Sequence, residues 1–130
     1  MYDVIIIGAG PAGISAGIYA VSRGQKALIL EKNQVGGLIR RVSAVTHYAA
    51  IVEGETGESF AKRLRKQAEN AGVEILKTEV KNVELTGVEK RIYTEKECYC
   101  AKKVILANGT SPRKLGIPGE IELAGRGIGM

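Results

Sequence analysis

A glycine-rich hexapeptide follows an apolar run near the start of the chain. The run is Val4–Ile7, and the hexapeptide from Gly8 to Gly13 has the pattern G-x-G-x-x-G. A buried strand that ends in this pattern and opens into a helix is typical of sites for a dinucleotide pyrophosphate. The start of such a helix presents unpaired N–H groups and a partial positive charge to an anion.

The three glycines predict three different backbone requirements. Gly8 makes the tight turn after the strand, Gly10 lets the backbone approach the phosphates, and Gly13 lets the helix pack close to the sheet. Pro11 stands at the first helical position, where proline is tolerated because that N–H would be unpaired anyway. The alternative interpretation is a strand–turn–helix unit that binds no ligand.

An acidic residue ends the next apolar run. Ala27–Leu30 is followed by Glu31, within the spacing expected for a carboxylate that accepts hydrogen bonds from ribose hydroxyls. A carboxylate at this place would repel a ribose 2′-phosphate, which argues against NADP here.

The elements that must position these residues alternate between strands and helices. Apolar runs predict parallel strands, and residues at helical spacing between them predict helices. The expected strands are 3–7, 26–30, 73–76 and 103–107, and the expected helices are 11–23 and 59–70.

Two further segments depart from this alternation. Between residues 78 and 100 apolar residues alternate with polar ones, which predicts a three-stranded antiparallel meander. Because both faces of apolar parallel strands must be covered, we expect an α/β fold with helices on one face of the sheet and the meander on the other. Residues 33–57 show no sustained period and predict a long irregular connection, a kind of loop that is usually functional.

Bulk properties narrow the class of protein. A chain of 130 residues predicts one domain, and no apolar stretch is long enough to span a membrane. The first strand begins within three residues of the start, which leaves no room for a signal peptide, so we expect a soluble cytoplasmic protein. The net charge of +5 comes from dispersed basic pairs, which favour anionic ligands but carry no nucleic-acid-binding motif.

The chain has two cysteines, Cys98 and Cys100, in a C-x-C arrangement. On a strand, both side chains point to the same face. The pair could be redox-active, could supply two metal ligands, or could be two free thiols. Two thiols alone do not complete a tetrahedral zinc site, and free thiols suit a reducing compartment.

The order of these features resembles the two-dinucleotide-binding flavoproteins, the pyridine nucleotide-disulfide oxidoreductase family. Within that family the chain is similar to the FAD-binding half of low-molecular-weight thioredoxin reductases. The resemblance covers nearly the whole chain. Its most specific parts are Gly8–Gly13, Glu31-Lys32, Gly36–Ile39, Ala107–Gly109 and Arg113–Glu120.

This resemblance implies a Rossmann-like FAD/NAD(P)-binding domain that uses FAD. It places the pyrophosphate on the hexapeptide, the adenosine ribose on Glu31, the adenine at the backbone of Val80, and the ribityl chain and flavin beside Gly36 to Leu38. The implied cofactor-binding residues are Gly8, Gly10, Pro11, Ala12, Gly13, Glu31, Lys32, Gly36, Gly37, Leu38, His47, Val80, Ala107, Asn108 and Gly109. Turn glycines and a core valine are the alternative interpretations of Gly37, Gly109 and Val80.

One segment departs from the family pattern. Where the family has Glu-Asn-Tyr-Pro-Gly, this chain has Thr46-His47-Tyr48-Ala49-Ala50. The family Asn approaches the flavin, so His47 is a candidate for a flavin contact, with a structural or surface histidine as the alternative. The change puts the usual electron donor of thioredoxin reductases in doubt.

A second departure concerns the extent of the chain. The family continues after Gly125–Ile128 into a redox-active C-x-x-C and an NAD(P)H-binding domain, and a last FAD-domain segment follows that domain. We therefore expect residues 1–130 to be a truncated FAD-binding domain, with no catalytic or metal-ligating residue and no activity alone. Expected partners are FAD, an NAD(P)H-binding portion or subunit, and a thioredoxin-like substrate, with a homodimer left open. A non-catalytic dinucleotide-binding module and a structural fragment with an empty site are the alternatives.

Overall fold

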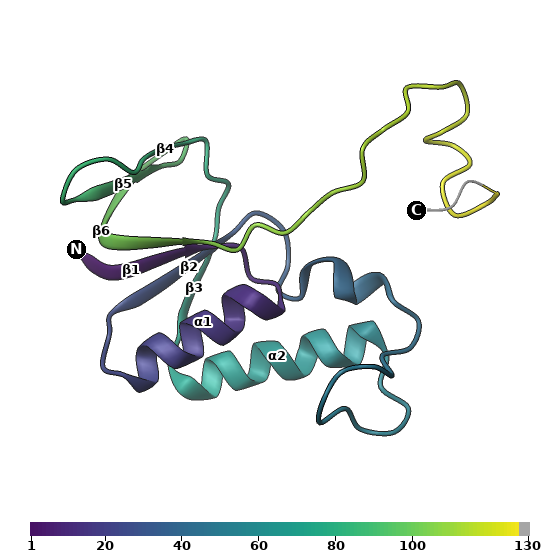
Figure 1. Ribbon diagram of the computed structural model, residues 1–130, viewed down its shortest axis with the longest axis horizontal. Coiled ribbons are helices and arrows are strands. Elements are labelled where there is room, and N and C mark those ends of the chain that lie inside the picture. The colour runs from purple at the N-terminus through teal and green to yellow at the C-terminus, as the bar shows by residue number, and fades with distance from the viewer. Residues whose placement is uncertain (128–130) are drawn as a thin grey trace.

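The computed structural model describes residues 1–127, which form a six-stranded sheet with two α-helices and a short 3-10 helix, η1 (Figure 1). The elements are β1 (Tyr2–Ile7), α1 (Pro11–Ser22), β2 (Ala27–Glu31), η1 (Gly37–Arg41), α2 (Gly57–Ala71), β3 (Glu74–Lys77), β4 (Asn82–Glu84), β5 (Lys90–Tyr93) and β6 (Cys98–Leu106).

The sheet has the strand order β3-β2-β1-β6-β5-β4. The first four strands in this order are parallel, and β5 and β4 continue the sheet in antiparallel pairs. In the central register Ile5 lies between Leu28 of β2 and Val104 of β6. The four predicted parallel strands therefore share one sheet, as the apolar runs indicated.

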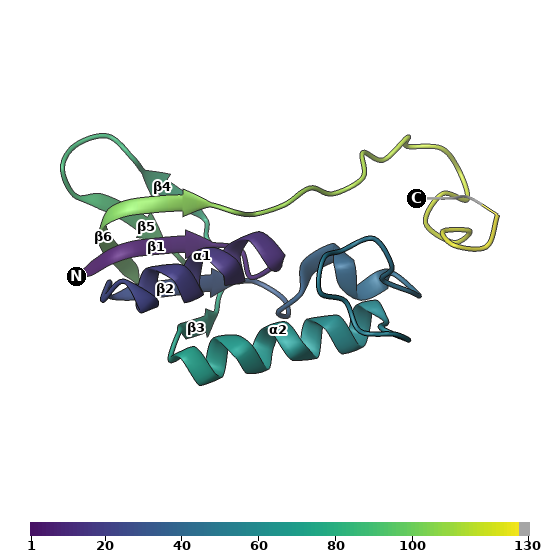
Figure 2. The ribbon, with the colours of Figure 1, turned by 60° about the horizontal axis from the view of Figure 1, so that its bottom comes forward.

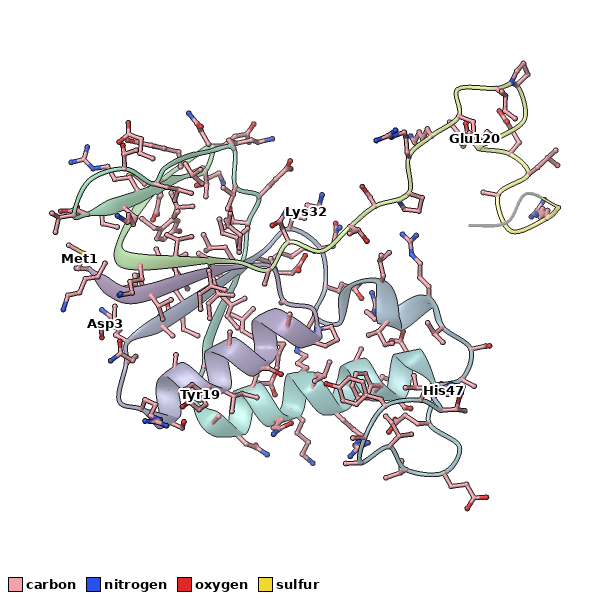
Figure 3. The ribbon with its side chains drawn as sticks, viewed as in Figure 1. Met1, Asp3, Tyr19, Lys32, His47 and Glu120 are labelled. Carbon is pink, nitrogen blue, oxygen red and sulfur yellow. The ribbon has the colours of Figure 1, made fainter. Side chains whose placement is uncertain are left out.

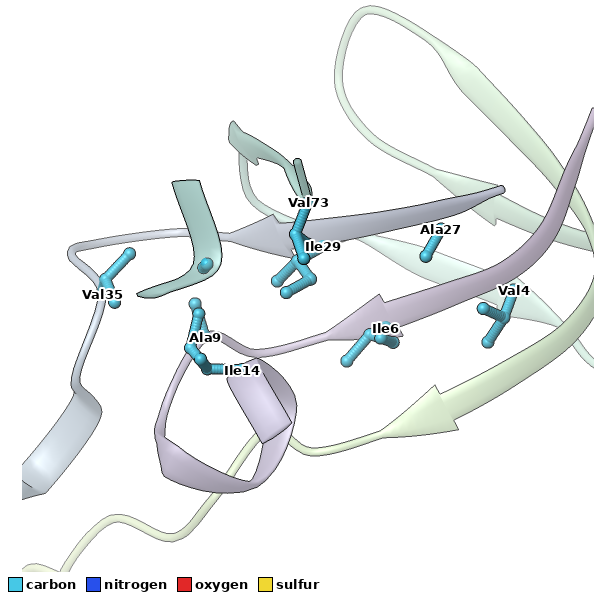
Figure 4. Close-up of a cluster of buried hydrophobic side chains, with 9 residues drawn as sticks. Val4, Ile6, Ala9, Ile14, Ala27, Ile29, Val35 and Val73 are labelled. Atoms are coloured by element: carbon cyan, nitrogen blue, oxygen red, sulfur yellow. The ribbon is translucent and has the colours of Figure 1, made fainter. Parts of the chain in front are cut away.

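Two apolar clusters cover the two faces of the sheet. On one face Val4, Ile6 and Ile29 pack with Ile14 of α1 and Ala68 of α2 (Figure 4). On the other face Ile5, Leu28 and Leu30 pack against Ile92 of β5 and Ala101 of β6. The predicted arrangement, with helices on one face and the meander on the other, is confirmed (Figure 2).

The meander and the fourth parallel strand are not separate elements. The sequence predicts a meander strand around Tyr99 and a second strand at 103–107, but the structure has one strand of nine residues, β6. Its first half pairs with β5, and its second half pairs with β1. No turn residue interrupts residues 98–106. One continuous strand therefore belongs both to the antiparallel meander and to the parallel part of the sheet.

The expected irregular connection at 33–57 contains two ordered pieces. Residues 37–41 form η1, and α2 begins at Gly57, two residues before the predicted start. Thr56 caps α2 by accepting a hydrogen bond from the Ser59 N–H, and the Ser59 side chain accepts one from the Thr56 N–H. This reciprocal capping motif starts helices, and it was missed because Ser replaces the usual Glu or Gln at its third position.

Residues 107–127 leave the sheet as an extended segment that projects away from both layers (Figures 1 and 2). Beyond residue 114 the segment turns, and the Glu120 carboxylate accepts hydrogen bonds from the N–H groups of Leu115 (2.7 Å) and Gly116 (2.8 Å). These bonds hold the pKa of Glu120 below its usual value. The apolar side chains of the segment are exposed, with Leu115 and Ile121 each at 73%.

The loop that departs from the family pattern contains a backbone position suited to glycine. Ala50 has φ +65°, and among residues 1–127 it is the only residue other than glycine with a positive φ. An L-residue pays about 1–2 kcal/mol in this conformation, and glycine pays about 0.5–1 kcal/mol in chain entropy. We predict that Ala50→Gly raises the free energy of unfolding by about 0.5–1 kcal/mol, measured by urea denaturation.

The neighbouring alanine supplies the control. Ala49 has no positive φ, so Ala49→Gly should lower the free energy of unfolding. Equal destabilisation by both substitutions would contradict the assigned backbone strain.

Candidate functional site: the edge where three strands end

Three of the four parallel strands, β1, β2 and β6, end beside the glycine-rich loop at one edge of the sheet. The loop connects β1 to α1. The Gly8 N–H donates to the Leu30 carbonyl at the end of β2 (2.9 Å), and the Ala107 N–H donates to the Ile7 carbonyl (2.8 Å). Open α/β sheets bind ligands outside the carboxyl ends of their strands, so this edge is the candidate site.

Two of the glycines are required by packing of backbone against backbone. A Cβ atom on Gly8 would lie 2.1 Å from the Ala107 carbonyl oxygen, and Gly8 has φ +108°. A Cβ atom on Gly13 would lie 1.8 Å from the Gly8 carbonyl oxygen. Gly8 makes the predicted tight turn, but the predicted role of Gly13 is only partly right, because its closest contact is with the turn itself and the sheet atom Ile6 Cγ2 would lie 3.5 Å from its Cβ. The glycine that brings α1 onto the sheet is Gly17, whose Cβ would lie 2.7 Å from the Ile29 Cδ1 atom.

Gly10 differs because nothing in the protein fills the space beside it. A Cβ there would come no closer than 3.8 Å to its nearest neighbour, the Gly36 carbonyl oxygen, and the backbone angles suit any residue. The fold does not need a glycine at this position. Gly10 also precedes the first turn of α1, no side chain caps that helix, and its first N–H groups have no acceptor within the helix. An open surface beside free N–H groups suits an anion.

The carboxylate of Glu31 lies against this loop. Its Oε1 atom accepts a hydrogen bond from the Ala9 N–H (2.8 Å), and its Oε2 atom accepts one from the Asn33 N–H (2.9 Å). Ala9 is fully buried, and its carbonyl accepts a hydrogen bond from the Gly36 N–H (2.8 Å). Ala9 therefore links Glu31 to the segment that precedes η1, a connection that no residue pattern had indicated.

The second glycine pair brings η1 next to the loop. Gly36 is buried with φ +117°, and a Cβ on it would lie 2.6 Å from the Ala61 Cβ atom of α2. A Cβ on Gly37 would lie 3.5 Å from the Gly10 Cα atom, so Gly37 and Gly10 are neighbours. Leu38 follows at the surface. The segment predicted to bind the pyrophosphate and the segment predicted to pass beside the ribityl chain therefore lie next to each other in the structure.

The remaining predicted residues surround the same edge less closely. Val80 is partly buried and packs on the sheet face opposite the helices, and the Thr78 N–H donates to the Glu31 carbonyl (2.9 Å). Lys32 is exposed just beyond Glu31. Asn108 and Gly109 are exposed where the chain leaves β6, and Gly109 has φ +65° with open space around it. Pro11 and Ala12 form the first turn of α1.

Comparisons with known proteins agree with this geometry. A sequence model of the pyridine nucleotide-disulphide oxidoreductase family matches residues 2–129. The chain belongs to this family. A thioredoxin reductase of Peptoclostridium acidaminophilum is 41% identical over 128 residues, which are 98% of this chain and 41% of that protein.

Solved structures of the family have the same fold. Lactococcus lactis thioredoxin reductase superposes with a TM-score of 0.87 at 36% identity, over 95% of this chain and 40% of that one. A ferredoxin-flavin thioredoxin reductase from Clostridium acetobutylicum gives 0.81 at 28% identity, over 97% of this chain and 43% of that one. The chain thus spans about two fifths of the length of these family members. No helix within residues 1–127 is both long and apolar enough to cross a membrane.

The segment that departs from the family pattern lies apart from the glycine-rich loop. His47 is exposed near the start of α2, well away from Lys32 (Figure 3), and its Nδ1 atom lies 2.8 Å from the Thr46 hydroxyl. The predicted flavin contact of His47 stays a prediction. The loop 43–55 lines a hollow of about 520 Å³.

One buried acid supports this loop, and the sequence did not single it out. The side chain of Glu55 is 1% exposed, and it accepts hydrogen bonds from the Ser59 hydroxyl and the Arg63 guanidinium. These bonds hold the pKa of Glu55 below its usual value, against the effect of burial. The Glu55 carbonyl also accepts a hydrogen bond from the Val45 N–H (2.9 Å), which closes the loop. The available signal was the spacing of four residues from Glu55 to Ser59 and from Ser59 to Arg63, although Glu55 itself precedes α2.

The two cysteines are free and lie at the other end of β6 from Ala107. The nearby Glu89 carboxylate, together with partial burial, raises the pKa of the Cys100 thiol. Within the described residues 1–127 no cluster of three or more His, Cys, Asp or Glu side chains could hold a metal ion.

The different surroundings of Gly10 and Gly13 give a matched pair of substitutions. Gly13→Ser places a Cβ against the Gly8 carbonyl, and we predict that it lowers the free energy of unfolding by about 1–3 kcal/mol. Gly10→Ser has room and supplies a preferred N-cap, so it should leave stability unchanged or raise it. Urea denaturation of both variants tests this, and a larger loss at Gly10 would contradict the packing described above.

Proposed function

We propose that this chain is the FAD-binding part of a thioredoxin-reductase-like flavoprotein oxidoreductase that passes electrons through FAD to a disulfide. The single observation that carries the proposal is Gly10. The protein's own packing does not require a glycine there, yet the position borders the free N–H groups at the start of α1.

The surrounding residues fit a dinucleotide. The start of α1 supplies donors for a pyrophosphate, and Glu31 supplies a carboxylate at the end of the neighbouring strand β2. Because each Glu31 oxygen accepts one backbone N–H, each keeps a lone pair for a ribose hydroxyl. Gly37 beside Gly10 leaves a surface without side chains along which a ribityl chain could pass.

The flavin of FAD would supply the redox chemistry, and these residues would bind and orient it. Gly8 and Gly13 fix the turn, α1 presents its N–H groups to the negative charge, and Glu31 fixes the adenosine end. The pattern G-x-G-x-x-G occurs once in the 130 residues, which fits one dinucleotide site. A site for the hydride donor and a disulfide relay would come from the rest of the enzyme.

The proposal predicts how FAD binding responds to substitution. Glu31→Ala should weaken binding by about 1–3 kcal/mol, the size of a hydrogen bond to a charged group. Gly10→Val should abolish close approach of the phosphates. Quenching of flavin fluorescence on titration measures both, with the unfolding midpoint recorded alongside.

Glu95→Ala is the control, because Glu95 is an exposed acid in the turn between β5 and β6 and its removal changes the charge equally. Unchanged FAD affinity in both site variants would show that the motif has only an architectural role here.

We also predict that the 130-residue chain alone does not reduce dithionitrobenzoate with NADPH or NADH when FAD is in excess. Such turnover needs a hydride donor, a flavin and a disulfide held in near-contact geometry. Turnover above about 1 s⁻¹, the low end for ordinary enzymes, would contradict the proposal that a further part of the enzyme is needed.

A further inference from the structure

Strand β6 holds its two cysteines on the side away from the core. Tyr99 packs against the apolar cluster that contains Ile5 and Ile92, and Ala101 is fully buried within it. Since successive strand residues point to opposite faces, Cys98 and Cys100 both point outward. Cys98 is exposed, Cys100 is partly exposed, and both are free thiols.

The strand keeps these thiols from joining each other. Residues two apart on a strand have Cα atoms about 6.6 Å apart and parallel Cα–Cβ bonds. That separation is near the upper limit for the Cα atoms of a disulfide. A disulfide also requires Cβ atoms within about 4.5 Å of each other. Parallel Cα–Cβ bonds keep the two Cβ atoms about 6.6 Å apart. The cross-strand partners of Cys98 and Cys100 are Tyr93 and Arg91, so the hydrogen-bonded ladder with β5 resists the backbone shift that would be needed. The pair therefore persists as two thiols.

Two sulfurs that cannot bond to each other can still bond to one atom placed between them. We propose that Cys98 and Cys100 form a two-sulfur binding site for a single soft, thiophilic centre, of which a trivalent arsenical is the example. Thiolate sulfur selects soft centres over hard ones. Zinc needs four ligands, and within residues 1–127 no third or fourth ligand joins the pair.

The binding reaction balances without an oxidant or a reductant. With phenylarsine oxide, the two S–H bonds and the arsenic–oxygen bond break, and two As–S bonds form. The oxygen leaves as water with both thiol protons, and arsenic stays trivalent.

The groups around the pair fit this reaction of neutral thiols. The nearby Glu89 carboxylate raises the pKa of Cys100, which favours the neutral thiol over the thiolate. Arg91 and Tyr93 flank the cysteines on the neighbouring strand. The site lies at the start of β6 and the candidate dinucleotide site lies at its end, roughly 20 Å away along the strand, so the inference does not depend on the proposed function.

The experiment uses the full chain, which has no other cysteine. The reduced protein is titrated with phenylarsine oxide without added thiol, and intact mass spectrometry counts the adducts. We expect one arsenical per chain and loss of both thiols to alkylation together. Cys98→Ser and Cys100→Ser should each weaken binding about 100-fold, because the second As–S bond then no longer forms within one molecule.

Two controls keep the result interpretable. Circular dichroism checks that each serine variant folds, and iodoacetamide checks that the remaining thiol is accessible. Reversal of the adduct by a dithiol, but not by an equal concentration of thiol groups from a monothiol, would support the two-sulfur site. Two arsenicals on the parent chain, or unchanged affinity in either serine variant, would overturn it.

Discussion

Two close backbone contacts in the glycine-rich loop leave no room for a side chain at Gly8 or at Gly13. The Ala107 carbonyl occupies the place of a Cβ on Gly8, and the Gly8 carbonyl occupies the place of a Cβ on Gly13. These two contacts bring together the ends of β1 and β6 and the start of α1. The direction in which the free N–H groups of α1 point is therefore set by backbone atoms alone, and backbone atoms are the least adjustable part of a folded chain.

Polar contacts then extend this rigid centre outward. Ala9 is buried between the Glu31 carboxylate and the Gly36 N–H, so β2 and the segment before η1 are both attached to the loop. Gly36 in turn packs on Ala61 of α2, and a Cβ on Gly57 would lie 1.9 Å from the Ile39 carbonyl oxygen of η1. A chain of close contacts thus runs from the glycine-rich loop to the start of α2, where Glu55 holds the loop that contains His47. Pre-organisation of this kind lowers the entropy cost of binding a large ligand.

The sequence predicted the parts of this arrangement that depend on local pattern. Apolar runs gave the four parallel strands, and the glycine spacing gave the loop at the edge where they end. The continuity of β6 was missed because alternation alone does not distinguish one long strand from two consecutive ones, and the absence of a turn residue between Cys98 and Leu106 was the signal that distinguishes them. Ala9 and Glu55 were missed for a different reason: an alanine amide has no side-chain signal, and an acid next to a loop looks like ordinary surface until its partners are placed.

Strand β6 pairs with both β5 and β1. It therefore restricts how the hairpin formed by β4 and β5 could be exchanged between relatives. Side chains alternate along β6 with a period of two, so Ala101 faces the core only if an even number of residues is added or removed between the hairpin and Ala107. A graft with an odd change in length would turn Cys98 and Cys100 toward Ile5 and Leu28 and expose Tyr99. Chimeras that respect this parity should keep their register, and recombination in the turn at 94–97 preserves it because β6 then transfers as one piece.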